Sequence, residues 1–200
     1  MAAATRMTGA MVSAALEATA AKIKPNDPSP FRKGDAVVYP AHGVGRIDRV
    51  GFEEIGGCRL YLIHISFEDN QMTLRIPVAQ ARAAGLRKLA GRQALAVALA
   101  ILTARPRASR LMWAKRSQEC LAKINTGKLD LLAEVVRDLQ SSGEGPGSSF
   151  SQRNLFELAL ERLAGEYATV NQIEKAEAIE MLKQALDRAR ANSTIAPLDA

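Results

Sequence analysis

The residues of this 200-residue chain that are best suited to chemistry are a lone tryptophan and the cations beside it. In a helix predicted over residues 110–125, Arg110 and Arg116 lie three residues before and after Trp113, so all three share one face. Lysine and arginine neutralise phosphates, and an aromatic ring can enter a base step or stack on an exposed base. The pattern therefore predicts a nucleic-acid contact centred on Trp113.

Burial in a helical bundle is the alternative for this tryptophan. Tryptophan is highly buried on average, and Leu111, Ala114, Leu121 and Ala122 lie well round the same helix, where they can face a core. A run of basic residues by itself is more often a solvated face. The pattern alone gives burial and exposure equal weight, and the combination of position and charge favours the contact with DNA.

The distribution of charge points to the same segment. The chain has a net charge of +6 and a pI near 9.6. Residues 101–125 hold six basic residues and one acidic residue, whereas residues 126–200 hold eight basic and twelve acidic residues. One short segment, which contains the only tryptophan, supplies nearly all the excess positive charge. This balance favours a polyanionic partner.

The other reactive residue types give no sign of catalysis or metal binding. His42, His64, Cys58 and Cys120 have no partners at catalytic or metal-ligand spacing, and the glycine pair within residues 43–45 is too short for a phosphate-binding loop. We therefore expect no enzyme, no metal and no cofactor. Two isolated cysteines are typical of a reduced, cytoplasmic protein, and no apolar run is long enough for a membrane span.

Short alternating segments predict a small antiparallel β barrel over residues 29–85. Gly56-Gly57 marks a tight turn within it, and Arg75 is expected on the face of its strand opposite to the apolar residues. The preceding residues 1–28 are predicted to be a disordered or weakly helical extension, because polar residues break the apolar run that a signal peptide needs.

Helical periodicity follows the barrel and predicts an all-helical domain over residues 86–190, with a flexible tail at 191–200. Ser109 is suited to cap the helix that carries Trp113. Ser149 with Gln152 could form a capping box for a later helix. The predicted fold class is therefore α+β, with a small N-terminal antiparallel β barrel followed by a C-terminal all-helical domain.

Six segments resemble the CarD/CdnL family of bacterial transcription regulators. The opening FRKGDAVVYPAHGVG at 31–45 is similar to the start of that family, and also to the polymerase-interacting domain of the transcription-repair coupling factor. A tryptophan followed by basic residues separates the regulators from the coupling factor. The resemblance covers roughly residues 30–190 and continues through MTLRIP at 72–77, GLR at 85–87, MWAKR at 112–116, KINTG at 123–127 and LAEVVRDL at 132–139.

The resemblance implies a division of labour between two domains. A Tudor-like barrel would dock on the β subunit of RNA polymerase through Arg75, and Glu53 and Ile55 are assigned to the same surface, although some relatives have a basic residue near Glu53. The helical domain would place Trp113 in the minor groove at the upstream edge of the transcription bubble, with Lys115 and Arg116 holding the DNA backbone. The implied result is a longer-lived open complex with housekeeping sigma holoenzyme, formed by a cytoplasmic monomer that reaches the nucleoid through polymerase.

Two other functions remain open. A small β barrel with basic neighbours can belong to an RNA-binding or ribosome-associated factor. That function predicts stacking aromatic residues on the barrel, whereas Tyr39, Tyr61 and Phe67 are expected mostly in its core. A protein-interaction adaptor would instead leave Trp113 buried.

Overall fold

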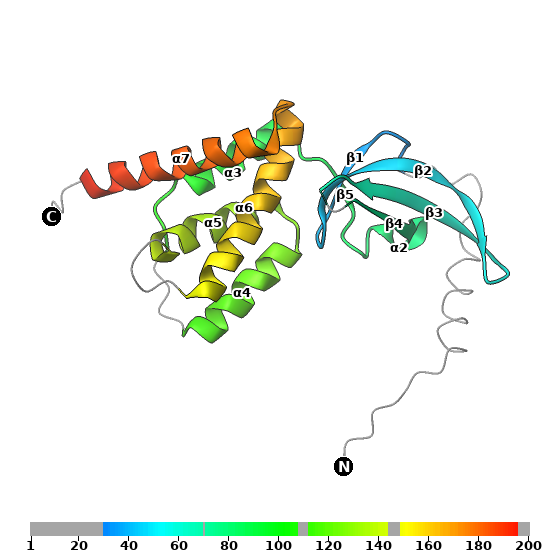
Figure 1. Ribbon diagram of the computed structural model, residues 1–200, viewed down its shortest axis with the longest axis horizontal. Coiled ribbons are helices and arrows are strands. Elements are labelled where there is room, and N and C mark those ends of the chain that lie inside the picture. The colour runs from blue at the N-terminus through cyan, green and yellow to red at the C-terminus, as the bar shows by residue number, and fades with distance from the viewer. Residues whose placement is uncertain (1–29, 70, 108–111, 144–148, 196–200) are drawn as a thin grey trace, which may run out of the picture. The chain divides into compact units, whose positions relative to one another are not determined.

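The computed structural model describes residues 30–69, 71–107, 112–143 and 149–195 (Figure 1). A β region is followed by a helical region, which confirms the predicted α+β order. The predicted extension at 1–28 and the candidate DNA contact Arg110 lie outside the described residues.

The β region is a five-stranded sheet in the order β4-β3-β2-β1-β5. Its pairings of β2 with β3, β3 with β4 and β1 with β5 are all antiparallel. The strands are β1 (Ala36–Tyr39), β2 (Gly43–Ile55), β3 (Cys58–Phe67), β4 (Met72–Pro77) and β5 (Arg87–Lys88).

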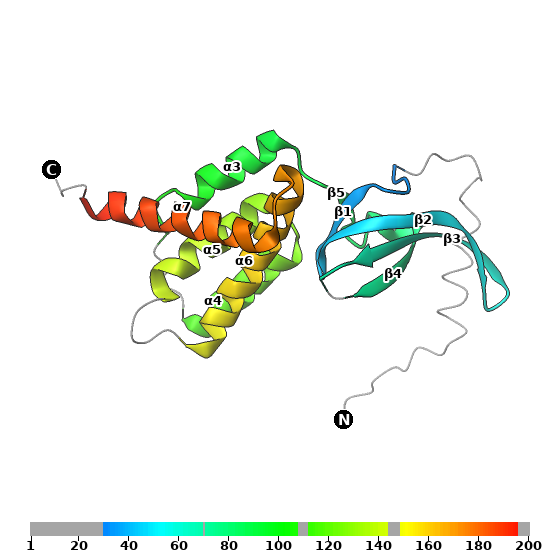
Figure 2. The ribbon, with the colours of Figure 1, turned by 45° about the horizontal axis from the view of Figure 1, so that its top comes forward.

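The β2–β3 hairpin closes through Gly56-Gly57, as the sequence predicts. Both glycines have positive φ, 60° and 79°, which is what the tightest hairpin turns require. β4 pairs only with Leu62–Phe67 of β3, so the end of the hairpin extends beyond β4 (Figure 2). The side chains near that end therefore have no third strand beside them.

One irregularity in β2 changes which side chains share a face. The register passes from Ile47 opposite Ile65 to Arg49 opposite His64, so a β-bulge lies between Ile47 and Arg49. Side chains alternate strictly between faces in a regular strand, and one extra residue moves all later residues to the other face. Ile47 and Ile65 are fully buried, whereas Arg49 lies on the opposite face, beside His64.

The core of the sheet requires a glycine at position 45. A Cβ there would lie 2.7 Å from Ile65 Cγ2 and 2.8 Å from Phe67 Cε1, which is closer than packed carbon atoms can approach. The fully buried Phe67 can therefore pack directly on the β2 backbone. After β4, the chain forms the short helix α2 (Val78–Ala81), whose C-cap is Arg82, and Gly85 has a positive φ of 80° before β5.

The helical region is built around one apolar core, to which each of the five described helices contributes. Ser149 Oγ accepts a hydrogen bond from the Gln152 amide, so this half of the predicted capping box is confirmed. The last helix runs to Ile195, past the predicted end near Arg190. The helices are α3 (Arg92–Leu102), α4 (Trp113–Asn125), α5 (Leu129–Gly143), α6 (Phe150–Asn171) and α7 (Lys175–Ile195).

Contacts divide the chain into two units, and the division differs from the predicted one. The sequence assigns all of residues 29–85 to the barrel, but Val37–Val44 belongs with the second unit, which resumes at Arg87. The physical reason is a set of hydrogen bonds in which the Arg162 guanidinium donates to the carbonyl oxygens of Pro40 and Ala41. In the same unit Arg87 pairs at 2.6 Å with Glu166, whose side chain is almost fully buried.

Candidate nucleic-acid interface and docking surface

Trp113 is the first residue of α4, and it is held by a residue of α6. Met112 before it has extended backbone torsions, so the helix begins three residues later than the predicted start at Arg110. The indole Nε1–H donates a hydrogen bond of 2.9 Å to Ser151 Oγ. The ring is half-buried and packs against the helical core, so neither full exposure nor burial in the interior describes it.

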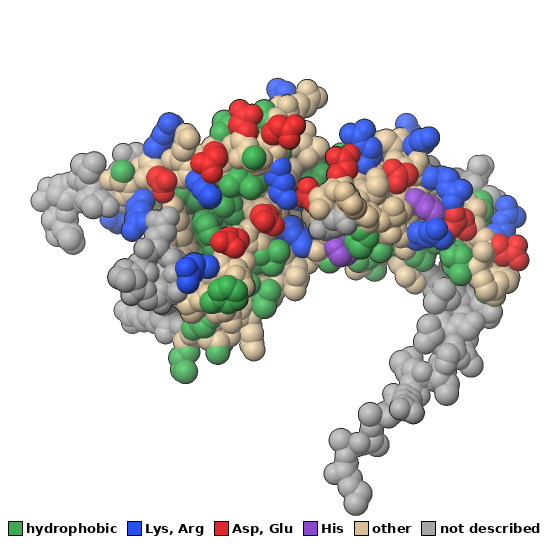
Figure 3. Space-filling model, in the orientation of Figure 1, with side chains coloured by type: hydrophobic (Ala, Val, Ile, Leu, Met, Phe, Trp, Pro, Cys, Tyr) green, Lys and Arg blue, Asp and Glu red, His purple; other side chains and the backbone are tan. Residues whose placement is uncertain are grey.

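Two exposed apolar side chains stand next to this pair in the sequence, one before Trp113 and one before its hydrogen-bond partner Ser151. Met112, directly before Trp113, is 82% exposed, and Phe150, directly before Ser151, is 75% exposed. Figure 3 shows hydrophobic side chains exposed over the starts of α4 and α6. The sequence did not identify Met112, Phe150 or Ser151 as site residues, because only the fold brings the starts of these two helices together.

The predicted cations that the structure describes lie on the first turns of α4. Lys115 is exposed, and Arg116 is partly exposed and donates a 2.7 Å hydrogen bond to the Asp138 carbonyl oxygen. The first turn of α4 contains no acidic residue. Positive charge is thus placed next to the indole.

A carboxylate on α5 fixes the chain that leads toward α4. Asp138 Oδ1 accepts hydrogen bonds from the Arg107 backbone N–H at 3.0 Å and from Arg137 Nε at 2.8 Å. Arg137 is only 6% exposed, so this ion pair is largely removed from water. The exposed Arg107 is therefore held beside α5, because Asp138 on that helix binds both the Arg107 backbone and the Arg116 side chain.

In the β region, which we call the barrel, Arg75 lies in a group of four polar side chains with Arg49, Glu53 and His64. It is exposed while its neighbour Ile76 is buried, as the alternation predicts. Glu53 reaches it at 3.6 Å and reaches His64 Nε2 at 3.2 Å, and Glu53 also forms an ion pair with Arg49. The sequence named Arg75 and Glu53 but missed Arg49 and His64, because the bulge in β2 hides the shared face.

His64 in this group is a neutral side chain at neutral pH. Burial lowers its pKa below the usual value near 6.5, and the positive charges of Arg49 and Arg75 lower it further, while Asp48 acts in the opposite direction. A neutral imidazole can lie between two guanidinium groups without adding to their repulsion.

Ile55, the third predicted docking residue, is 47% exposed at the end of β2. On the same hairpin Phe52 packs against Tyr61 with ring centroids 4.6 Å apart, and Arg59 lies 4.6 Å above the Phe52 ring. Phe67 is buried as expected, but Tyr61 is only partly buried, because β4 does not reach this part of β3.

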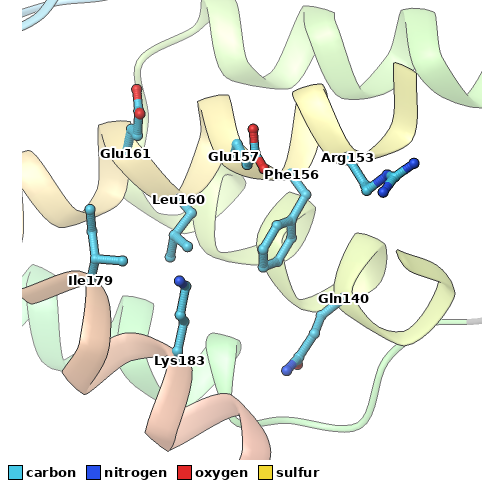
Figure 4. A pocket seen from close by; sticks show the side chains of 8 residues that line it. All are labelled: Gln140, Arg153, Phe156, Glu157, Leu160, Glu161, Ile179 and Lys183. Atoms are coloured by element: carbon cyan, nitrogen blue, oxygen red, sulfur yellow. The ribbon is translucent and has the colours of Figure 1, made fainter. Parts of the chain in front are cut away.

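A separate pocket of about 440 Å³ lies among α5, α6 and α7. Phe156 and Leu160 of α6 point toward Lys183 of α7 and Gln140 of α5 (Figure 4). Its lining contains none of the residues predicted to bind DNA or polymerase, so we assign it no part in those contacts.

No three histidine, cysteine, aspartate or glutamate side chains in the described ranges are grouped so that they could hold a metal ion. Within the same ranges, no helix combines the length and the apolar character needed to cross a bilayer. The thiol of Cys120 is buried in the helical core, and burial raises its pKa, which suits an unreactive structural thiol.

The β region and the helical region both match family models of CarD domains. Residues 31–90 match the family model "CarD-like/TRCF RID domain", and residues 97–183 match "CarD, C-terminal domain". YdeB of Bacillus subtilis (strain 168), by its name a candidate transcription factor, is 29% identical over 145 residues, which are 72% of this chain and 94% of YdeB. The solution structure of the 72-residue N-terminal domain of Myxococcus xanthus CarD is 31% identical, covers 29% of this chain and 77% of that domain, and has a TM-score of 0.26.

Proposed function

The chain belongs to the CarD/CdnL family of transcription regulators, and we propose that it docks on the β subunit of RNA polymerase and prolongs the life of the open promoter complex. The barrel matches the domain that the regulators share with the coupling factor, a polymerase-interacting domain. The helical unit, which matches the regulators' own C-terminal domain, would bind the promoter DNA.

The observation that carries the DNA part of the proposal is the tethered indole at the start of α4. Its hydrogen bond to Ser151 fixes the ring, so little side-chain entropy remains to be lost when the ring meets DNA. Exposed Met112 and Phe150 add apolar surface around it. An apolar wedge that enters a base step needs such surface, together with cations for the flanking phosphates.

In the proposed mechanism Trp113 enters the minor groove at the upstream edge of the transcription bubble. Lys115 and Arg116, with Arg110 on the same predicted stripe, neutralise the phosphates on either side of the widened step. Stacking of an aromatic ring on a base contributes roughly 1–3 kcal/mol. This energy is available only while the duplex edge is open, so it slows reannealing.

The docking part of the proposal rests on the barrel face that carries Arg75. Its guanidinium is well exposed, with 61% of the side chain accessible, and Glu53 lies beneath it. Ile55 adds an exposed apolar contact at the end of β2. A charged contact beside a small apolar contact is typical of the rim and core of a protein interface.

This function requires no catalytic group and no cofactor. We further propose that the protein acts as a monomer on the polymerase holoenzyme that carries the housekeeping sigma factor, in the cytoplasm, where that enzyme meets the nucleoid. Two different surfaces, one for protein and one for DNA, are sufficient for this role.

One observation bears on the RNA-binding alternative. The Phe52–Tyr61 pair supplies aromatic residues on the barrel, as that function predicts. Arg59, however, lies over one face of the Phe52 ring, and a stacking base would have to displace it. The barrel surface therefore favours a protein partner over an RNA base.

The test is the lifetime of open complexes formed by purified polymerase on a supercoiled or linear promoter. We expect Trp113→Ala to shorten the lifetime added by the protein roughly 5- to 150-fold, as the loss of a stacking contact requires. Trp113→Phe keeps a ring and should retain part of the effect. Polymerase affinity, measured in parallel without DNA, should not change.

An unchanged lifetime with Trp113→Ala would remove the wedge from the mechanism. A loss of polymerase affinity in that variant would show that the helical unit, not the barrel, carries the docking surface.

A further inference from the structure

Three side chains on the barrel form a row across three strands. Arg49 of β2 lies opposite His64 of β3, and His64 lies opposite Arg75 of β4. Directly opposite residues in antiparallel strands have their Cβ atoms about 4.5–5.5 Å apart. The two arginines are therefore two strands apart on one face of the sheet, with the neutral His64 between them.

The β-bulge in β2 is the reason that Arg49 belongs to this row. Ile47 faces the core opposite Ile65, and a regular strand would send Arg49 to the core as well. The extra residue instead brings Arg49 to the face of His64 and Arg75. Bulges often re-aim a side chain in this way beside functional sites.

Glu53 lies under the two guanidinium groups. Its side chain is 19% exposed, against 57% for Arg49 and 61% for Arg75. One carboxylate oxygen meets Arg49 and His64, and the other lies 3.6 Å from Arg75. Glu53 thus offsets the repulsion between the arginines and leaves their outer N–H groups directed to solvent.

Each guanidinium has five N–H donors arranged in a planar fork. Glu53 takes up only part of this capacity, so two partly occupied forks remain on an exposed surface. A planar carboxylate is the group that such forks bind best, since it accepts two parallel hydrogen bonds.

We infer that Arg49 and Arg75 together bind one aspartate or glutamate side chain of the polymerase, and that Glu53 positions the two guanidinium groups for it. The inference rests on the proposed docking role of the Arg75 face and assigns Arg49 to that role as a second binding residue. Glu53 is in this scheme a positioning residue, which acts through the arginines.

The charge of this face favours a single carboxylate over a nucleic-acid strand. Glu53 compensates one of the two arginines, and along β2 the exposed Arg46 is matched by Asp48, which accepts a hydrogen bond from Ser66. The net charge of about one unit is too small for a contact that depends on several phosphates. It is sufficient for one carboxylate beside an apolar residue such as Ile55.

The experiment measures the affinity of the full chain for purified polymerase without DNA. We expect Arg49→Gln to weaken binding about tenfold, which is typical for the loss of one charge-assisted contact. Arg59→Gln is the matched control, because it removes the same charge from the same hairpin but on the opposite face; it should change the affinity less than twofold. Circular dichroism of both variants confirms that they are folded.

A chemical probe identifies the partner group. Arg49→Lys keeps the charge and provides an amine, which a water-soluble carbodiimide joins to a nearby carboxylate as an amide with loss of water. Peptide mapping should then find position 49 joined to an acidic residue of the polymerase, while Arg59→Lys gives no such product.

The outcomes separate this inference from the function on which it rests. If Arg75→Glu abolishes polymerase binding but Arg49→Gln does not weaken it, the inference is wrong and the docking role of the face stands. If neither substitution weakens binding, both are wrong. Loss of affinity for promoter DNA alone in Arg49→Gln would assign this face to nucleic acid and also overturn the inference.

Discussion

The barrel face around Arg75 and the start of α4 around Trp113 use opposite means to present a binding group. On the barrel, ion pairs among Arg49, Glu53 and Arg75 place charge at the surface, and the strand register sets their positions. At α4, a single neutral hydrogen bond to Ser151 holds an apolar ring, and the charges stand beside it. One site is ionic and the other is apolar.

This difference implies different responses to solution conditions. Salt screens exposed ion pairs, so a contact made by the barrel face should weaken as ionic strength rises. Burial of an indole in a base step is a mainly apolar interaction, which salt affects much less, but the proposed phosphate contacts of Lys115 and Arg116 also weaken as salt rises. Attachment to polymerase and stabilisation of melted DNA should therefore be separable by substitution rather than by salt alone.

The largest expected effect comes from reversing a charge on the ionic side. Arg75→Glu would place a second carboxylate beside Glu53 and meet the partner with the wrong sign. We expect polymerase affinity to fall about 100-fold, in the range for removal of one member of an interfacial charge pair. Titration calorimetry or a pull-down, with circular dichroism as the folding control, measures it. Equal affinity for this variant and the wild type would make Arg75 an ordinary surface residue.

The next largest effect is expected on the helical side, at the carboxylate that fixes the chain before α4. Asp138→Ala would leave Arg137 buried without its ion-pair partner and release the Arg107 amide. We expect a loss of about 3 kcal/mol in the free energy of unfolding, measured by urea denaturation, and a shorter open-complex lifetime.

Glu134→Gln on the same helix is the control for Asp138→Ala. It breaks a more exposed pair with Lys123, whose contribution should be under about 1 kcal/mol. Equal losses of stability in the two variants would show that Asp138 acts as an ordinary surface partner.

A smaller effect is expected at the hydrogen bond of the indole. Ser151→Ala removes the acceptor of Trp113 Nε1, so the ring can adopt other orientations. We expect the open-complex lifetime to fall about threefold and the free energy of unfolding to change by no more than about 1 kcal/mol. A shift of the tryptophan emission maximum reports the altered surroundings of the ring.

Ser117→Ala provides the comparison, because Ser117 Oγ donates its hydrogen bond to the Ala114 carbonyl within α4 and not to the indole's partner Ser151. If it shortens the lifetime as much as Ser151→Ala, the tether has no special role.

The smallest effect is expected from the titration of His64. Its pKa is lowered in the folded protein, so near pH 6 the unfolded chain binds more protons than the folded chain. Stability should be fully present above the unfolded pKa of about 6.5 and decline as the pH falls toward the lower folded value. His64→Gln should flatten this part of the stability curve, measured by thermal unfolding between pH 5.5 and 7.5. A curve of unchanged slope would mean that other groups control it.

Local sequence patterns were sufficient where one short segment determines the structure. The turn at Gly56-Gly57, the cap at Ser149 and the exposed face of Arg75 followed from turn chemistry, capping and alternation. The order of a β region and a helical region was also correct. Each of these features depends on residues within a few positions of one another.

Features that depend on distant contacts could not be predicted in this way. Ser151 is 38 residues from Trp113, and no local pattern links them. Alternation alone would place Arg49 toward the core, because nothing in the sequence of β2 marks the bulge. The start of α4 at Trp113 was also missed, since Ser109 offered an earlier cap.

The β-bulge at Ile47–Arg49 allows this hairpin to lose one residue and still keep its row of polar side chains. An in-frame loss of the single codon for Asp48 would remove the extra residue and restore regular pairing. Arg49 would then follow Ile47 directly, so its side chain would stay opposite His64 on the face away from the core. Related genes that lack this one codon should therefore still encode proteins with the arginine at the surface.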